Sequence, residues 1–290
     1  MQHQRLVRAA LPRRHLLTAA AALLAISSCR LFAQTIERAE TMSARLRGLA
    51  GAAVLLLGEQ HDAPDHQRLA VDVVQALAHT GQLAGVVMEM LPIGRSSRAI
   101  SPSAGADEIQ QTLAWDNGAW PWTAYADIVT AAVRAGVPVL GGDLPRHQLR
   151  EAMSRTDLDR RLPPAALARQ MQWMREGHCQ LLPESQILPM ARMQIARDIS
   201  LAQACVQVAR TARPGQTVLL ICGSVHADKA LGVPQHLPDD LISRSVRLIG
   251  RGVDAGDGQF DAHWLTEPGP VTDHCAALRE QFKSRPAAKP

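Results

Sequence analysis

The residues VLLLGEQHDAPDH, numbered 54–66, decide how the rest of the sequence is interpreted. The stretch begins with four apolar residues, Val54 to Leu57, and its polar residues gather at the other end. A short apolar run without alternation is typical of a strand buried on both faces of a parallel sheet. We therefore predict a buried strand that carries Glu59 and His61 to one point at its carboxyl end.

Three further apolar runs lie at 85–88, 137–140 and 217–221, and helical patterns separate them. The first helical pattern begins near Pro64, a residue that is favoured in the first turn of a helix. Strands that alternate with helices indicate the layers of an α/β fold. The predicted fold class is therefore α/β, with a mainly parallel sheet flanked by helices.

Residues 150–212 interrupt this alternation of strands and helices. Apolar residues from Ala191 to Ala209 recur every three or four positions, which predicts one long helix. An earlier helix is expected over 165–177. We interpret 150–212 as a helical insertion, or subdomain, between the third and fourth strands.

The boundaries of the folded domain follow from these patterns. Two late strands are expected at 245–249 and 263–266, where short apolar runs occur again. One domain is therefore predicted to cover 45–268, and a weakly patterned tail follows at 269–290.

The first 28 residues have the order of a secretory signal peptide: arginines without acids, a short apolar run and then small residues. The sequence Ile-Ser-Ser-Cys at 26–29 fits a lipobox, in which Cys29 is lipidated and becomes the first residue of the mature chain. We therefore expect an exported protein of the cell envelope, anchored by lipid to a membrane and facing the periplasm. The alternative is cleavage after Ala33, which would leave a soluble periplasmic protein.

Loss of the signal peptide removes the basic character of the chain. The whole sequence has 31 Lys and Arg against 27 Asp and Glu, and the four basic residues of the signal peptide account for the difference. A neutral mature chain gives no electrostatic basis for binding nucleic acid.

Four cysteines remain besides Cys29: Cys179, Cys205, Cys222 and Cys275. An oxidising compartment would allow a disulfide among them, but their spacing does not select a pair. Cys205 and Cys222 are expected to be small buried apolar residues.

Ionisable residues follow each of the four predicted strands. Carboxyl ends of parallel strands lie along one edge of a sheet, and ligands bind at that edge. We therefore expect these side chains to meet, although they are far apart in the chain. They are Glu59, His61, Glu89, Asp143 and His226.

Two chemical roles are open for this cluster. One is general acid–base catalysis, because carboxylates and imidazoles shift one another's pKa values. Its residues would be Glu59, His61, Glu89 and His226. The other is a divalent metal site with nitrogen and oxygen ligands. Its ligands would be Glu59, His61, Asp143 and His226. The alternative to both is that each side chain only hydrogen-bonds backbone groups at a strand end.

Aromatic residues are concentrated in one segment, which holds Trp115, Trp120, Trp122 and Tyr125. Tyr125 is the only tyrosine of the chain. These rings could form the wall of a flat apolar ligand, with the phenol binding ferric iron, or they could fill the core. His178, at the end of a predicted helix, is a second candidate for an iron ligand.

An ordered series of motifs resembles the ChaN-like haem-binding lipoproteins. The motifs are LLGEQHDAPDHQR (56–68), VVMEML (86–91), WDNGAWPWTAY (115–125), GGDLPR (141–146), LPESQILPMARMQIARDISLA (182–202) and CGSVHADKALGVPQHL (222–237). One such motif alone would be weak, whereas the series in this order is specific.

The resemblance implies a lipid-anchored, haem-binding protein of bacterial iron acquisition, with an α/β core and a helical subdomain. Haem in that family is associated with tyrosine ligation, which would make Tyr125 the iron ligand and place Trp122 beside it. His178 is the second candidate for the iron, and Arg146 is available to a haem propionate. The expected partners are haem, a membrane, a second copy of the chain and haem or iron uptake machinery of the outer membrane.

The family is related at greater distance to the TIKI/TraB metalloproteases and the erythromycin esterases, which also carry a G-E-x-H-like element on a first strand. The alternative function is therefore a metal-dependent or acid–base hydrolase that uses the strand-end Glu and His residues. Haem binding is favoured, and enzymatic activity is left open.

Overall fold

The computed structural model describes residues 41–269 and 273–284. The predicted signal peptide and Cys29 lie outside these residues, so lipidation and cleavage stay predictions. In the part of the chain that is described, no helix has the length and apolar character needed to cross a membrane.

The chain divides into two compact units, 1–48 and 49–290. In the first unit the described residues are few, and 41–47 form a helix. The second unit contains the sheet and the predicted cluster of ionisable residues.

The second unit is built on a sheet in which all neighbouring strands are parallel and the order is β3-β2-β4-β1-β5-β6. The strands are β1 (Val54–Glu59), β2 (Leu83–Pro92), β3 (Val139–Asp143), β4 (Thr217–Gly223), β5 (Ser243–Gly250) and β6 (Ala262–Thr266). The apolar run at 54–57 lies in β1, which is buried throughout and has a parallel partner on each side. The predicted α/β fold with a parallel sheet is confirmed.

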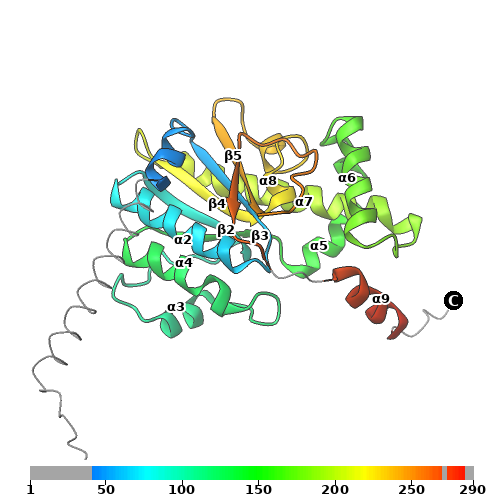
Figure 1. Cartoon of the computed structure of the whole chain (residues 1–290), viewed down its shortest axis with the longest axis horizontal. Helices are drawn as coiled ribbons and strands as arrows, with labels where there is room; N and C mark the ends of the chain where they lie inside the picture. Colours follow the sequence, from blue (N-terminus) through cyan, green and yellow to red (C-terminus); the bar gives the residue numbers. More distant parts are fainter. Residues whose placement is uncertain (1–40, 270–272, 285–290) are drawn as a thin grey trace, which may run out of the picture. The chain divides into compact units, whose positions relative to one another are not determined.

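Helices cover both faces of this sheet (Figure 1). The main ones are α2 (Pro64–His79), α3 (Ala106–Leu113), α4 (Trp122–Arg134) and α7 (Glu184–Ala209). α2 and α4 pack together on one face, and α3 packs against α4. The C-terminal half of α7 covers the other face, where Leu201 and Cys205 pack in one core with Leu56.

The predicted insertion at 150–212 consists of two different parts. In this region the helices before α7 are α5 (Arg146–Ala152), η1 (Thr156–Arg160) and α6 (Pro164–Gly177). Two further short helices, α8 (Ser224–Ala227) and η2 (Val233–His236), follow β4 outside this region. Up to Ala196 the helices pack on one another, around Leu158 and Ile195. From Leu201 onward α7 packs on the sheet, because a parallel connection needs a crossover helix on the sheet face. Only the first part is therefore separate from the sheet.

A disulfide attaches the C-terminal segment to the rest of the unit. It joins Cys179, just after α6, to Cys275 in α9 (His274–Ser284). The predicted tail at 269–290 therefore contains a helix that is covalently attached. Cys205 and Cys222 are free and buried, as predicted.

Candidate functional site

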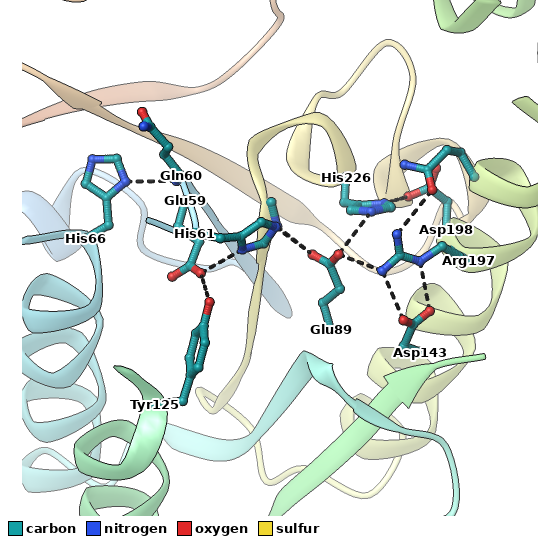
Figure 2. Close-up of polar contacts among 12 residues, drawn as sticks. Glu59, Gln60, His61, His66, Glu89, Tyr125, Asp143, Arg197, Asp198 and His226 are labelled. Carbon is teal, nitrogen blue, oxygen red and sulfur yellow. Dashed lines mark hydrogen bonds and ion pairs between the residues drawn. The ribbon is translucent and has the colours of Figure 1, made fainter. Parts of the chain in front are cut away.

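Side chains from neighbouring strands meet at the carboxyl edge of the sheet (Figure 2). Glu59 ends β1, Glu89 lies in β2, Asp143 ends β3, and His226 lies in α8 directly after β4. The strand order places β3, β2, β4 and β1 side by side, so these four positions are adjacent. The structure thus brings together the residues of the predicted cluster, although they are distant in the sequence.

Glu89 lies at the centre of the cluster and is only 2% exposed. Its Oε2 accepts a hydrogen bond of 2.7 Å from the backbone N–H of Gly223, and its Oε1 accepts one of 2.7 Å from Arg197 Nη2. The Nε2 atoms of His226 and His61 lie 3.5 and 3.8 Å from its carboxylate oxygens. Burial opposes ionisation, but His226 and Arg197 outweigh it and hold the pKa of Glu89 well below its usual range. Glu89 is therefore a buried carboxylate at neutral pH.

Arg197 of α7 forms ion pairs with two carboxylates at once. Besides Glu89, it binds both oxygens of Asp143, with Nε to Oδ1 and Nη2 to Oδ2 distances of 2.9 Å each. Burial disfavours its charge, but Glu89 and Asp143 raise the pKa of Arg197 above the ordinary value. This two-pronged geometry is the strongest kind of Arg–carboxylate contact, and it fixes a permanent cation between β2 and β3.

His226 is held between two carboxylates and is 3% exposed. Its Nδ1 lies 2.6 Å from Oδ1 of Asp198, which is also buried, and its Nε2 faces Glu89. Burial would lower the pKa of His226, but Glu89 and Asp198 raise it to about 10. The ring is therefore protonated at neutral pH, and in that state both nitrogens are donors and neither can bind a metal or accept a proton.

His61 is the member of the cluster that reaches the solvent, with 35% of its side chain exposed. Its Nδ1 lies 2.9 Å from Oε1 of Glu59, and the ring packs edge-on against Trp120 with the ring centroids 4.7 Å apart. Burial opposes protonation, yet the hydrogen bond that His61 donates to Glu59 and the charge of Glu89 raise the pKa of His61. A Cβ atom at Gly223 would lie 2.9 Å from His61 Nε2, so the absence of a side chain there leaves room for the imidazole.

The loop that carries His61 is shaped by His66. The Nδ1 of His66 accepts a hydrogen bond of 2.9 Å from the backbone N–H of Gln60, and Pro64 starts α2 directly after the loop. Burial lowers the pKa of His66 to about 4, so the ring stays a neutral acceptor at neutral pH. The second imidazole of the opening sequence thus has a structural role.

Tyr125 supports the cluster from the inside of the protein. Its side chain is 1% exposed, and its hydroxyl donates a hydrogen bond of 2.7 Å to Oε1 of Glu59. Burial and the charge of Glu59 raise the pKa of Tyr125, so the phenol stays neutral. The rings of Trp115 and Trp120 lie 5.9 and 6.2 Å from it, and Trp122 is buried beside them, 5.0 Å from Trp115.

A cavity of about 560 Å³ opens above the cluster. Its walls include aromatic, cationic and apolar side chains, and all residues of the cluster except Asp143 line the cavity. The lining residues include His61, Trp120, Arg247, Val253 and His274. This volume is in the range of small-molecule and cofactor sites.

None of the four predicted haem-binding residues lines this cavity: Tyr125 and Trp122 are buried, and His178 and Arg146 make other contacts. His178 caps the end of α6, where its Nδ1 lies 2.9 Å from the carbonyl oxygen of Met174. Arg146 has 78% of its side chain exposed and lies 3.7 Å from a carboxylate oxygen of Asp116. Neither residue lines the cavity.

The structure shows no preformed metal site in the part of the chain that it describes. Over residues 41–269 and 273–284, no group of three or more His, Cys, Asp or Glu side chains is arranged to hold a metal ion. The physical reason is that cations already occupy the cluster: Arg197 binds Asp143, and His226 is protonated. The assignment of Glu59, His61, Asp143 and His226 as metal ligands therefore stays a prediction.

Sequence reasoning did not place Arg197 and Asp198 in the cluster. Both lie in the sequence between Ile195 and Ile199 of the predicted long helix, and two adjacent charged residues inside such an apolar segment are a signal of a buried ionic site. Their partners come from other strands, which the sequence alone does not identify.

Comparisons with known proteins agree with this architecture. The model of a family described as haem-binding uptake, Tiki superfamily, ChaN, matches residues 45–237, which is two thirds of the chain. A solved structure described as cofacial haem binding to ChaN of Campylobacter jejuni is similar, with 22% identity, 74% of this chain and 89% of that chain covered, and a TM-score of 0.62. No curated protein matches the sequence.

Two other solved structures share less with this chain. The type III effector HopBA1 is 14% identical, with 75% of this chain and 88% of that chain covered and a TM-score of 0.45. A mutant of the erythromycin esterase EreC in its open conformation is 13% identical, with 68% and 70% covered and a TM-score of 0.43.

Proposed function

This chain belongs to the haem-binding uptake family of the Tiki superfamily, to which ChaN belongs, and from that membership we propose that it binds haem in the cavity at the carboxyl edge of its sheet. The resemblance stated from the motifs is confirmed at the level of the family. The observation that carries the proposal is that His61, the partly exposed imidazole of the cluster, lines this cavity while Glu59 holds its Nδ1.

His61 is oriented as a ligand for haem iron. Its Nδ1 lies 2.9 Å from Oε1 of Glu59, which fixes the ring, and its Nε2, 3.8 Å from Oε2 of Glu89, is the nitrogen left for the iron. Metal-binding histidines commonly donate their other ring N–H to a carboxylate, which fixes the ring and raises its basicity. Because Glu59 and Glu89 raise the pKa of His61 against the effect of burial, iron must displace a proton, and binding should strengthen as the pH rises.

The other walls of the cavity suit the remaining parts of a porphyrin. Trp120 and Val253 offer apolar surface to the ring. Arg247 lines the cavity, and among the described residues it makes no ion pair within 4.0 Å, so its guanidinium can receive a propionate. Its hydrogen bond to the carbonyl oxygen of Ala255 holds it in place. Bound haem would supply the iron that an uptake protein passes on.

Tyr125 is the second candidate for the iron ligand. Its buried hydroxyl donates to Glu59 and does not line the cavity, so ligation would require it to lose its proton and leave this hydrogen bond. We therefore place the iron at His61 and let experiment decide between the two side chains. Trp122, buried behind Tyr125, would then support the site and not touch the ligand.

We also propose that the chain is exported, anchored through Cys29 and active in haem or iron acquisition. The order of residues in the first 28 positions supports export. The disulfide between Cys179 and Cys275 supports it independently, because disulfides persist in oxidising compartments. The proposed partners are a second copy of the chain, since the ChaN structure is described as cofacial haem binding, and uptake machinery of the outer membrane.

Titration of the purified mature chain with hemin tests the proposal. We expect a saturable shift of the Soret band that His61→Ala removes, while His79→Ala, an exposed histidine on α2, leaves it unchanged. Tyr125→Phe should keep the wild-type spectrum. Loss of the spectrum in Tyr125→Phe with retention in His61→Ala would move the iron to Tyr125.

A second function, acid–base hydrolysis, is favoured by one specific observation. His61 bridges Glu59 and the cavity, and Oε2 of Glu59 is buried without a hydrogen-bond partner among the described residues. Such a pair could hold and release a proton during cleavage of an ester. The test is hydrolysis of activated esters by the wild type and by Glu59→Gln; equal rates in the two proteins would contradict this function.

A further inference from the structure

The C-terminal segment brings another imidazole to the cavity. His274 is the first residue of α9 and lines the same cavity as His61. Its Nε2 lies 3.3 Å from Oδ2 of Asp62, which also lines the cavity. The other oxygen of Asp62 accepts a hydrogen bond of 2.7 Å from the side chain of Gln60. The contact therefore joins α9 to the loop that carries His61.

A disulfide attaches the residue next to this histidine. Cys275 is bonded to Cys179, which lies two residues after the end of α6. Cys179 and Gln180 have φ angles of 55° and 59°, a conformation that is uncommon for residues other than glycine. This sharp turn carries the chain away from the helix axis at the point where the disulfide forms. The S–S bond therefore attaches the residue next to His274 to this turn.

Both cysteines of this disulfide are partly exposed, so a small dithiol can reach it. The other two cysteines, Cys205 and Cys222, are buried, and burial raises the pKa of both thiols, which makes them unreactive. Among the cysteines of the described residues, the disulfide that attaches α9 is therefore the group that a small dithiol reduces.

We propose that the Cys179–Cys275 disulfide is a redox-dependent clamp that holds His274 on the cavity wall, where its imidazole contacts the bound ligand. The proposal rests on the haem site proposed above. A dithiol transfers two electrons and two protons: the S–S bond breaks, two cysteine thiols form, and the dithiol closes into its own disulfide. α9 then loses its covalent attachment, and the contact between His274 and Asp62 is released. The oxidised chain binds its ligand more tightly than the reduced chain.

A double-mutant cycle with hemin separates this clamp from a purely structural disulfide. The variants of the mature chain are His274→Ala, the pair Cys179→Ser and Cys275→Ser, and the three substitutions together. Each of the first two should weaken hemin binding roughly tenfold, which corresponds to about 1.4 kcal/mol. The triple variant should be no weaker than either, because both changes remove the same contact. His79→Ala is the matched control.

Treatment of the wild type with a dithiol should reproduce the effect of the cysteine substitutions, and reoxidation should reverse it. If the cysteine substitutions weaken binding by the same factor with and without His274, the disulfide acts through general stability and the clamp is refuted. If His274→Ala binds hemin as tightly as the wild type, the proposed contact is refuted while the haem site stands.

Hydrogen–deuterium exchange of the ligand-free chain tests the clamp without hemin. It therefore still decides for or against the clamp if no form of the protein binds hemin and the proposed function fails. The clamp predicts that reduction speeds exchange at 274–280 and at 60–62, and leaves β4 unchanged. Unchanged exchange at 60–62 after reduction would show that the disulfide does not hold the segment against the loop that carries His61, and the clamp would be overturned.

Discussion

Replacement of Arg197 by Met should destabilise the protein far more than the same replacement at the surface. Arg197 makes one hydrogen bond of 2.7 Å to Glu89 and two of 2.9 Å to Asp143, and the side chain is 16% exposed. Met has a similar volume but no charge, so the variant leaves both carboxylates without their cation. Breaking a buried ion pair by removing one partner costs about 3–5 kcal/mol, and we expect a loss in this range at pH 7.

The matched control is Arg155→Met. Arg155 also pairs with a carboxylate, that of Asp157 at 2.7 Å, but 56% and 53% of the two side chains are exposed. Exposed pairs of this kind contribute little to stability, because water and salt screen them. Urea denaturation of the mature wild type and of both variants, at equal m-values, gives the comparison. An equal loss of stability in the two variants would refute the reasoning, since burial of Arg197 would then contribute nothing.

The dependence of this loss on pH provides a second check. Arg197 and His226 depress the pKa of Glu89 against the effect of burial, so Glu89 contributes stability that is present above pH 4.5, its ordinary pKa, and is lost as the pH falls. In Arg197→Met much of this contribution is already absent. The difference between wild type and variant should therefore be largest at neutral pH and shrink on acidification below 4.5. A difference that grows on acidification would contradict the assignment of charges.

Three further predictions follow from the same geometry. The folded pKa of His226 is raised to about 10, so its contribution to stability is complete below pH 6.5, its ordinary pKa, and is lost as the pH rises toward 10. The urea midpoint of His226→Gln should therefore vary less over this pH range than that of the wild type. Gly223→Ala places a Cβ 2.9 Å from His61 Nε2, so it should lower hemin affinity while circular dichroism shows an unchanged fold; wild-type affinity would contradict this. Substitution of both Cys179 and Cys275 by Ser should lower the free energy of unfolding, and with it the thermal midpoint that calorimetry measures. The loss of free energy has an upper limit of about 4.7 kcal/mol, the value for a closed loop of about 100 residues.

The sequence was sufficient to predict the sheet and the meeting of its strand ends. Four apolar runs of strand length, separated by helical patterns, leave few arrangements besides a parallel sheet. A parallel sheet in turn gathers the residues that follow its strands, which is why Glu59, Glu89 and His226 could be placed together before their contacts were known.

The chemical state of the cluster was not predictable in this way. It depends on Arg197, which lies 108 residues after Glu89 and whose side chain reaches β2 and β3 from α7. Contacts of this kind depend on side-chain geometry in the folded chain, and the spacing of residues in the sequence does not predict them. The sequence likewise gave no sign that a guanidinium lies between Glu89 and Asp143.

The aromatic segment shows the same limit at a single residue. The sequence identified Tyr125 as unusual and left open whether it meets a ligand or fills the core. The structure buries the phenol and directs its proton to Glu59, so His61 and not Tyr125 reaches the solvent. The cavity wall formed by Arg247 and His274 comes from distant parts of the chain and could not be foreseen.

Anomalous diffraction at the iron absorption edge, from crystals of the mature chain soaked or grown with hemin, tests the haem site most directly. The account predicts an iron peak inside the cavity, within bonding distance of His61 Nε2 and on the side away from Glu59. An iron peak beside His178, or a well-ordered hemin with an empty cavity, would contradict it.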